Sequence, residues 1–449
     1  MLTEQDQKRL AEEMQEHLIN LIRINTSNPP GNEMAAAVYI KEALEKEGIE
    51  AEVLESAPNR GNMVCRLKGD GSKKPLLIAG HIDVVDVVEE EWSVPAFEGL
   101  KKDGFIWGRG SLDMKFTIAK YLVLVMELKR RNFPLKRDII FAATADEEQN
   151  SFYGMHWMCE NHFDRIEAEY SLNEGGGYCI SLNGKNMYNC QTAEKGSAWY
   201  KLVTKGEPGH GSVPKADNPI LRMSRAIEKI SKPMPQKRIP IVQEIISGLS
   251  KRMLGGAKGL VLSQVLNPVL GKPVAKLISK VDSDIGDMIY ALSHDTVSAT
   301  IINAGDKENV IPDRCEAMID VRLLPGQTAA AFREFLLKTL DIDEVELVRE
   351  GCPDPTESPA DTELFRAVEK AVMSNDPDAV VLPLLMPAAT DSRFLRQKGV
   401  IAYGFSPLRS KVPVQEFLPT IHGHDERIPY DDFEFTVKVF YDLLTDFCG

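Results

Sequence analysis

Short apolar runs alternate with segments of helical periodicity along this chain, and that alternation restricts the folds it can adopt. We predict buried strands for the runs "PLLIAGHIDVV", "RDIIFAATA" and "AEYSLNEGGG". Apolar residues recur at helical spacing between them, in "MKFTIAKYLVLVMELKRRN" and "YGMHWMCENHF". Strands that alternate with helices form mainly parallel sheets with helices on both faces. The sequence therefore predicts an α/β fold with a mainly parallel central sheet flanked by helices.

The pattern changes near residue 194. The stretch "GSAWYKLVTKGE" alternates like a half-solvated strand, and a β-α-β-β-α order continues to about residue 350. We therefore expect a small α+β domain over residues 194–352, inserted in a larger domain made of residues 1–193 and 353–449. Two domains also suit a chain of 449 residues, because a single core rarely serves that length.

Residues 233–292 form a helix-like excursion with Gly and Pro inside the expected small domain. A phosphate-binding loop is one interpretation of its "LGGAKG" stretch. That stretch lacks the G-K-[ST] ending and a clear preceding strand, so we expect a lid or an interface elaboration instead.

Charge and cysteine content narrow the partners and the compartment. The net charge is −14, which disfavours nucleic acid and anionic membranes as main partners, because both need a basic face. The seven cysteines are scattered and form no C-x-x-C pair, as expected of reduced thiols. The amphipathic N-terminal segment lacks the features of a signal peptide, and no stretch suits a membrane span. We therefore expect a soluble, cytoplasmic protein.

Side chains that can bind metals gather at the ends of the predicted strands and in the loops beside them. They are His81, Asp83, Asp113, Glu147, Glu148, Glu174 and His422. Singly, each has an ordinary explanation, such as a helix N-cap for an Asp or a solvated face for a Glu pair. Their repetition at one end of a sheet favours a shared site, since open α/β sheets bind ligands there. Imidazoles and carboxylates suit zinc and, without cysteine, also manganese or cobalt.

Nine short stretches, several of which contain the side chains named above, follow one another over nearly the whole chain. They are "GHIDVV", "WSVPAF", "GRGSLDMK", "DEE", "NEGGG", "PGHGSVP", "NVIPDRCEAMIDVR", "PAATDSRF" and "HGHDERIP". In this set the chain resembles the co-catalytic metallopeptidases and amidohydrolases. That family includes aminoacylases, glutamate carboxypeptidases, succinyl-diaminopimelate desuccinylases, acetylornithine deacetylases and carnosinase-like dipeptidases. Each stretch is weak alone, and the ordered set is specific; "PAATDSRF" looks closest to aminoacylases.

The resemblance implies a site for two divalent metal ions, zinc first, with manganese or cobalt as alternatives. Asp113 would bridge the two ions. His81 and Glu174 would complete one site, and Glu148 and His422 would complete the other.

The resemblance also assigns residues that act beside the metals. Asp83 would bond the second nitrogen of His81 and fix its tautomer. Glu147 would be the general base. The family spacing H-x-x-D-E selects His422 as the C-terminal ligand, although His424 is also near. Three adjacent acids in "ADEE" should repel one another, and divalent cations would compensate their charge.

The resemblance also implies that three residues of the small domain contact the substrate. His210 would approach the scissile carbonyl, often from the partner subunit of a homodimer, and Asn309 and Arg322 would bind the substrate carboxylate. From the residues alone, the solvent face of an alternating strand is the first interpretation of Arg322.

The implied function is hydrolysis of an amide or peptide bond next to a free carboxylate. An N-acyl amino acid, a dipeptide or a peptide C-terminus would serve as the small-molecule substrate. A non-catalytic metal-binding relative on the same fold is the alternative, and a scaffold that keeps only the architecture is a third interpretation.

Overall fold

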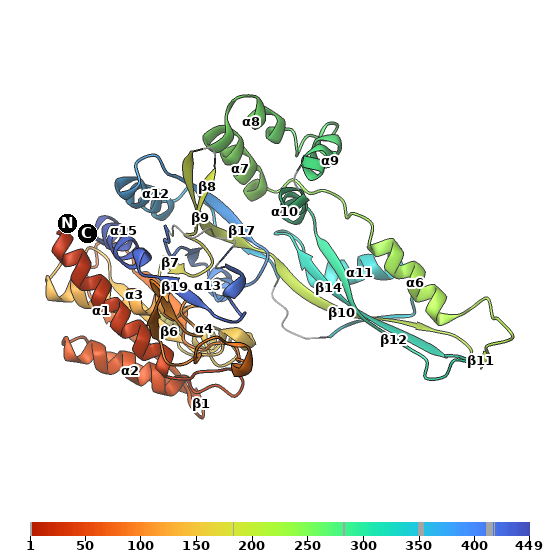
Figure 1. Cartoon of the computed structure of the whole chain (residues 1–449), viewed down its shortest axis with the longest axis horizontal. Coiled ribbons are helices and arrows are strands. Elements are labelled where there is room, and N and C mark those ends of the chain that lie inside the picture. Colours follow the sequence, from red (N-terminus) through yellow and green to blue (C-terminus); the bar gives the residue numbers. More distant parts are fainter. Residues whose placement is uncertain (1, 183, 282, 349–353, 410–415, 417) are drawn as a thin grey trace.

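A ten-stranded sheet forms the centre of the larger part of the molecule (Figure 1). The computed structural model describes residues 2–182, 184–281, 283–348, 354–409, 416 and 418–449. Along the main path the strands are β1 (Ala51–Ala57), β2 (Arg60–Leu67), β6 (Ile139–Thr144), β3 (Leu76–His81), β7 (Tyr170–Asn173), β18 (Ile401–Gly404), β9 (Lys185–Glu194) and β16 (Thr356–Glu357). Two more strands pair with β9: β8 (Cys179–Leu182) and β17 (Val380–Met386).

The middle of this sheet is parallel. β3 pairs in parallel with β6 and with β7, and β18 continues the parallel arrangement beside β7. Antiparallel pairs occur towards the margins, at β1–β2–β6 and around β9. The predicted α/β fold with a mainly parallel central sheet and flanking helices is confirmed.

Helices cover both faces of the sheet. Successive side chains of a strand point to opposite faces, and the buried strands are apolar on both, so each face needs a covering layer. In β3, Leu76 and Ile78 belong to one core, and Leu77 and Ala79 belong to another on the opposite face. The first core is shared with α1 (Glu4–Arg23), α2 (Glu33–Lys46), α3 (Lys115–Arg130), α12 (Glu363–Asn375) and α15 (Asp431–Cys448). The second is shared with α4 (Met155–Asn161), α5 (Phe163–Ile166) and α13 (Ser392–Gln397).

A separate antiparallel sheet lies beyond the large one (Figure 1). Its order is β12 (Thr296–Ala304), β14 (Arg314–Leu323), β10 (Gly196–Lys205) and β15 (Glu344–Leu347), and α6 (Pro219–Ile230) and α11 (Ala329–Thr339) pack on it. Because this unit has its own core, we propose the division into residues 1–193, 194–352 and 353–449. The last boundary falls outside the described residues.

The helical excursion of residues 233–292 packs against both the large sheet and the inserted unit. It comprises α7 (Pro240–Gly248), the π-helical turn η3 (Leu249–Leu254), α8 (Gly256–Ser263), α9 (Gly271–Val281) and α10 (Ser283–Ser293). Its core includes Ala193 and Leu385 of the large sheet and Leu324 of the inserted unit. "LGGAKG" follows a helical turn rather than a strand, so the arrangement of a phosphate loop is not formed there.

Smaller elements complete the described chain. β4 (Leu100–Lys102), β5 (Phe105–Trp107) and β19 (Arg427–Pro429) form a three-stranded sheet, and β11 (Gly209–His210) pairs with β13 (Val310–Ile311) at the far end of the inserted unit (Figure 1). Three 3-10 turns are η1 (Glu89–Glu91), η2 (Glu147–Gln149) and η4 (Leu418–Thr420). None of the described helices combines the length and apolar character that crossing a membrane requires.

Candidate metal centre

Three parallel strands place three of the five candidate ligands at one edge of the large sheet. His81 is the last residue of β3, while Glu148 follows β6 and Glu174 follows β7. Because β3 lies between the other two and all three run the same way, their carboxyl ends meet. The alternation of strands and helices in the sequence therefore places these side chains together.

Two groups of ligand atoms share one carboxylate. His81 Nε2 lies 3.1 Å from Asp113 Oδ1 and 3.6 Å from Glu174 Oε1. His422 Nε2 lies 3.1 Å from Asp113 Oδ2 and 3.2 Å from Glu148 Oε1. Within each group the candidate ligand atoms all lie within 4.8 Å of one another. Two imidazoles and three carboxylates, without a thiolate, are a donor set that fits two divalent ions.

Asp113 is not a helix N-cap, which was the ordinary explanation for it. Helix α3 begins at Lys115, and Met114 occupies the N-cap position without a side-chain bond. The carboxylate of Asp113 faces the two imidazoles instead. Its pKa is lowered: burial raises it, but bonds from His422 and His81 outweigh burial.

Asp83 lies directly behind His81. His81 Nδ1 is 3.0 Å from the carbonyl oxygen of Asp83 and 3.3 Å from its Oδ1, and both residues are buried. The other ring nitrogen of His81, Nε2, therefore faces Asp113 and Glu174. The carboxylate of Asp83 also accepts the backbone N–H groups of Glu147 and Glu148, each at 3.1 Å. One side chain thus orients an imidazole and the turn that carries the two glutamates.

The site concentrates buried negative charge. Burial, together with the nearby carboxylate of Glu174, raises the pKa of Glu147 well above its usual range. Burial also raises the pKa of Glu174 to about 7. Bonds to Asp113 and Glu148 raise the pKa of His422 to about 10. Cations between these groups would compensate the charge of the buried carboxylates and favour their ionised forms.

Glu426 supports the loop that carries Asp113, and sequence reasoning missed it. Its fully buried carboxylate pairs with Arg109 at 2.7 Å. It also accepts the backbone N–H groups of Gly110 at 3.0 Å, Leu112 at 2.6 Å and Asp113 at 3.1 Å. The available signal was its place in "HGHDERIP", beside the candidate ligand of the same stretch.

The structure does not bring the three residues of the inserted unit to this centre. β11, which contains His210, lies at the end of the inserted unit that is remote from the large sheet (Figure 1). There His210 Nδ1 is 2.7 Å from Ser212 Oγ, and the carbonyl of Asn309 accepts the N–H of Gly211. Arg322 Nε donates to Asp320 at 2.8 Å, within β14.

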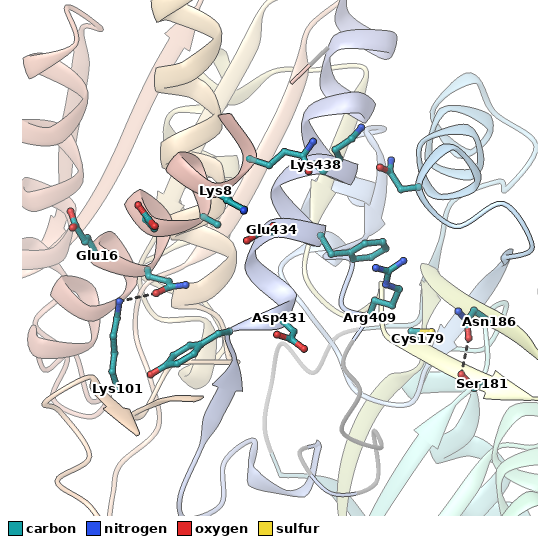
Figure 2. A pocket seen from close by; sticks show the side chains of 17 residues that line it. Lys8, Glu16, Lys101, Cys179, Ser181, Asn186, Arg409, Asp431, Glu434 and Lys438 are labelled. Atoms are coloured by element: carbon teal, nitrogen blue, oxygen red, sulfur yellow. Dashed lines mark hydrogen bonds between the residues drawn. The ribbon is translucent and has the colours of Figure 1, made fainter. Parts of the chain in front are cut away.

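The region beside the ligands contains a small, mainly apolar cavity. Its volume is about 90 Å³, and Asp113 and Glu174 form part of its wall. The apolar side chains around it are Leu112, Met114, Phe116, Tyr178, Met386, Leu408 and Ile421. A larger and strongly polar pocket, of about 1270 Å³, lies elsewhere, among α1, α15 and β8 (Figure 2). None of the predicted site residues lines that second pocket.

A family model and several known proteins match this chain. The model of "Peptidase family M20/M25/M40" matches residues 77–446. The chain is 30% identical over 391 residues to the N-fatty-acyl-amino acid synthase/hydrolase PM20D1 of Mus musculus, with 84% of this chain and 74% of that protein covered. It is 28% identical over 433 residues to aminoacylase-1 of Sus scrofa, with 94% and 92% covered.

Solved structures show the same fold at low sequence identity. The M20 family metallo-carboxypeptidase Sso-CP2 from Sulfolobus solfataricus superposes with a TM-score of 0.69 at 19% identity, covering 97% of this chain and 99% of that one. A dinuclear metal binding peptidase of the M20 family from Bacillus subtilis gives a TM-score of 0.58 at 16% identity, covering 97% and 98%.

Fold, ligand set and relatives together define a hydrolase of the peptidase and aminoacylase type. The chain belongs to peptidase family M20/M25/M40, since the family model spans most of its length. The resemblance predicted from the ordered motifs is thereby confirmed.

Proposed function

We propose that this protein is a dinuclear metal-dependent hydrolase that cleaves an amide or peptide bond next to a free carboxylate. The observation that carries the proposal is the pair of ligand groups that share Asp113 at the carboxyl edge of the sheet. His81 and Glu174 would hold one ion with Asp113, and Glu148 and His422 would hold the other. Zinc is the first candidate, and manganese or cobalt would suit the same donors.

The ions, when bound, would supply Lewis acidity that activates water and polarises the carbonyl. The chain's own residues have the remaining tasks. Asp83 orients the ring of His81 through Nδ1 and holds the backbone of the glutamate turn. Glu147, whose burial raises its pKa, would take the proton from the attacking water and deliver it to the leaving amine. Its place directly before Glu148 puts the base beside a ligand.

The substrate would be an N-acyl amino acid, a dipeptide or a peptide C-terminus. The names of the relatives support this class, because fatty-acyl amino acids, acylated amino acids and carboxypeptidase substrates all carry a carboxylate. The apolar walls of the cavity beside Asp113 and Glu174 suit an apolar group of the substrate.

The inserted unit would complete the site from a second copy of the chain. His210 and Asn309 lie together at the remote end of that unit, so a neighbouring site in a homodimer is where they would act. There His210 would stabilise the developing oxyanion. Asn309 and Arg322 would bind the substrate carboxylate, and Arg322 lies at the other end of the inserted unit, where it pairs with Ser197 and Thr296 in the sheet. The described cysteines are all free, which supports a reducing, cytoplasmic compartment.

The test combines metal analysis with a substrate screen. We expect the purified protein to contain two equivalents of metal and to hydrolyse at least one N-acyl amino acid or dipeptide. The variant Glu147→Gln should keep both ions and lose about 10²–10⁴-fold in turnover. Undiminished hydrolysis in that variant would remove Glu147 from the mechanism. Two bound metals without any hydrolysis would indicate a non-catalytic binding protein, and a folded protein that binds no metal would indicate a scaffold.

A further inference from the structure

A buried polar cluster lies behind the turn that carries Glu147 and Glu148. We call it the Arg60 clasp, and its members are Asn28, Glu33, Arg60, Asp83 and Asp146. Each is at most 8% exposed. They come from five separate segments: the loop before α2, the start of α2, the start of β2, and the ends of β3 and β6. Such a cluster of side chains needs a reason, because burying charged groups without partners is costly.

Arg60 holds the clasp together. Its Nη2 donates to Asp146 Oδ1 at 2.8 Å and to Asn28 Oδ1 at 2.9 Å, and its Nη1 pairs with Glu33. Among the described Arg and Lys side chains, Arg60 alone forms ion pairs with Glu33 and Asp146. The planar guanidinium can reach these partners at once, which a Lys ammonium on a single stem would not reproduce.

Asn28 connects the clasp to the metal centre. Its Nδ2 donates to Asp83 Oδ2 at 2.9 Å and to Asp146 Oδ1 at 3.0 Å. Asp83 is the side chain that faces His81 Nδ1 and accepts the N–H groups of Glu147 and Glu148. A continuous chain of bonds therefore runs from Arg60 to the candidate base and a candidate ligand.

Asp146 anchors the turn itself. Its Oδ2 accepts the N–H of Tyr153 at 3.0 Å, and its carbonyl accepts the N–H of Ser151 at 2.6 Å. Asp146, Asn150 and Ser151 have φ angles of 67°, 79° and 61°, in the left-handed region that non-glycine residues rarely adopt. A turn with three such residues depends on contacts from outside, and Arg60 and Asn28 provide them.

We propose that Arg60 is a positioning residue that, through Asp146, Asn28 and Asp83, sets where Glu147 and Glu148 stand at the metal centre. The proposal rests on the proposed function for its kinetic consequence. Without the guanidinium, Glu33 and Asp146 lose the cation that pairs with both, Asp146 keeps only the bonds from Asn28 and Tyr153, and the turn between this cluster and the metals is displaced. The ion that Glu148 helps to hold is then affected more than the ion held by His81 and Glu174.

Arg60→Lys tests the proposal because it keeps the charge and removes the fork. The control is Arg137→Lys, which changes another buried arginine that pairs with Glu169 and Glu363 away from the site. For both we would measure the melting temperature, the affinity of each metal equivalent in metal-free protein, and kcat and KM. We expect Arg60→Lys to weaken one of the two metal equivalents and to lower kcat, each about 10–100-fold, with a small change in KM. Arg137→Lys should lower only the melting temperature.

A purely structural role for Arg60 would have a different signature. If Arg60→Lys lowers the melting temperature as the control does and leaves kcat and both metal affinities within about twofold, the proposal is wrong.

Asp146→Asn gives a second test of the proposal, because it keeps the shape of the side chain and removes its charge. The double variant should lose no more than the more severe single variant, since both act through the same turn. Additive losses would show independent action. If the wild-type protein binds metal but hydrolyses nothing, the proposed function fails, and the metal affinities still decide the role of Arg60.

Discussion

Glu148 and His422 are 274 residues apart in the chain, yet Glu148 Oε1 and His422 Nε2 lie 3.2 Å apart. The first residue follows β6, and the second lies in the segment before β19. The fold brings these two distant segments to one edge of the sheet, where the carboxylate of Asp113 lies between His422 and His81.

His422 and His424 should differ in their effect on metal content. His422 faces Asp113 and Glu148, whereas His424 Nε2 pairs with Glu91 at 2.6 Å. We expect His422→Ala to lose one of two metal equivalents, because it removes one ligand of a three-residue group. His424→Ala should keep both. Elemental analysis of the two purified variants decides this, and loss of metal from His424→Ala alone would reverse the assignment.

Metal-free protein should lose stability as the pH rises through the acid-to-neutral range. Burial raises the pKa of Glu174 from 4.5 to about 7, so the folded state holds a proton there that the unfolded state releases. That contribution is full below pH 4.5 and disappears as the pH passes about 7. Melting temperatures of chelated protein at a series of pH values measure the decline. Glu174→Gln should make the decline shallower; an identical slope in that variant would show that other groups cause it.

Glu426 should contribute strongly to the stability of the folded protein. Replacing it by Ala leaves Arg109 buried without its partner and removes three bonds to the loop of Asp113. We expect a loss of about 3–5 kcal/mol in the free energy of unfolding, measured with urea. Asp425→Ala is the control, since its carboxylate bonds only the exposed Ser93 among the described contacts and should cost about 1 kcal/mol or less. Equal losses in both variants would contradict the role given to Glu426.

A mixing experiment should show whether His210 acts in a second subunit. Glu147→Gln supplies an intact His210, and His210→Ala supplies an intact Glu147. If the proposed dimer is correct, unfolding and refolding the two inactive variants together should restore activity. One site of each mixed dimer then has both groups. Refolding each variant alone is the control, and light scattering reports the dimer. No recovery from a mixture that does form dimers would place His210 in its own chain's site.

The central sheet and the polar residues at the ends of its strands could be predicted because both depend on local patterns. Alternation in β3 separates Leu76 and Ile78 from Leu77 and Ala79 on opposite faces, and helical periodicity marks the covering elements. Polar residues directly after such strands, as at His81 and Glu174, must then lie at the sheet edge. The ordered motifs predicted the family, which the family model confirms.

The residues that support the candidate site could hardly be recognised from their local sequence. Arg60 stands at the start of a strand, in "PNRGNMVCRL", where an exposed Arg would be ordinary. Its partners Asn28, Glu33 and Asp146 are 32, 27 and 86 residues away. Packing of α2 on β2, and of the loop before α2 against the end of β6, makes these groups neighbours, and burial then requires that their charges be paired.

By itself, the sequence determined the alternation of strands and helices and the chemical types of the side chains at the strand ends, because periodicity encodes which face is buried. Tertiary structure decided the rest. It put Asp113 between His81 and His422, buried Glu426 under the loop of Asp113, and carried His210 to the far end of the inserted unit. These relationships depend on strand order and loop packing between distant segments, which no local pattern specifies.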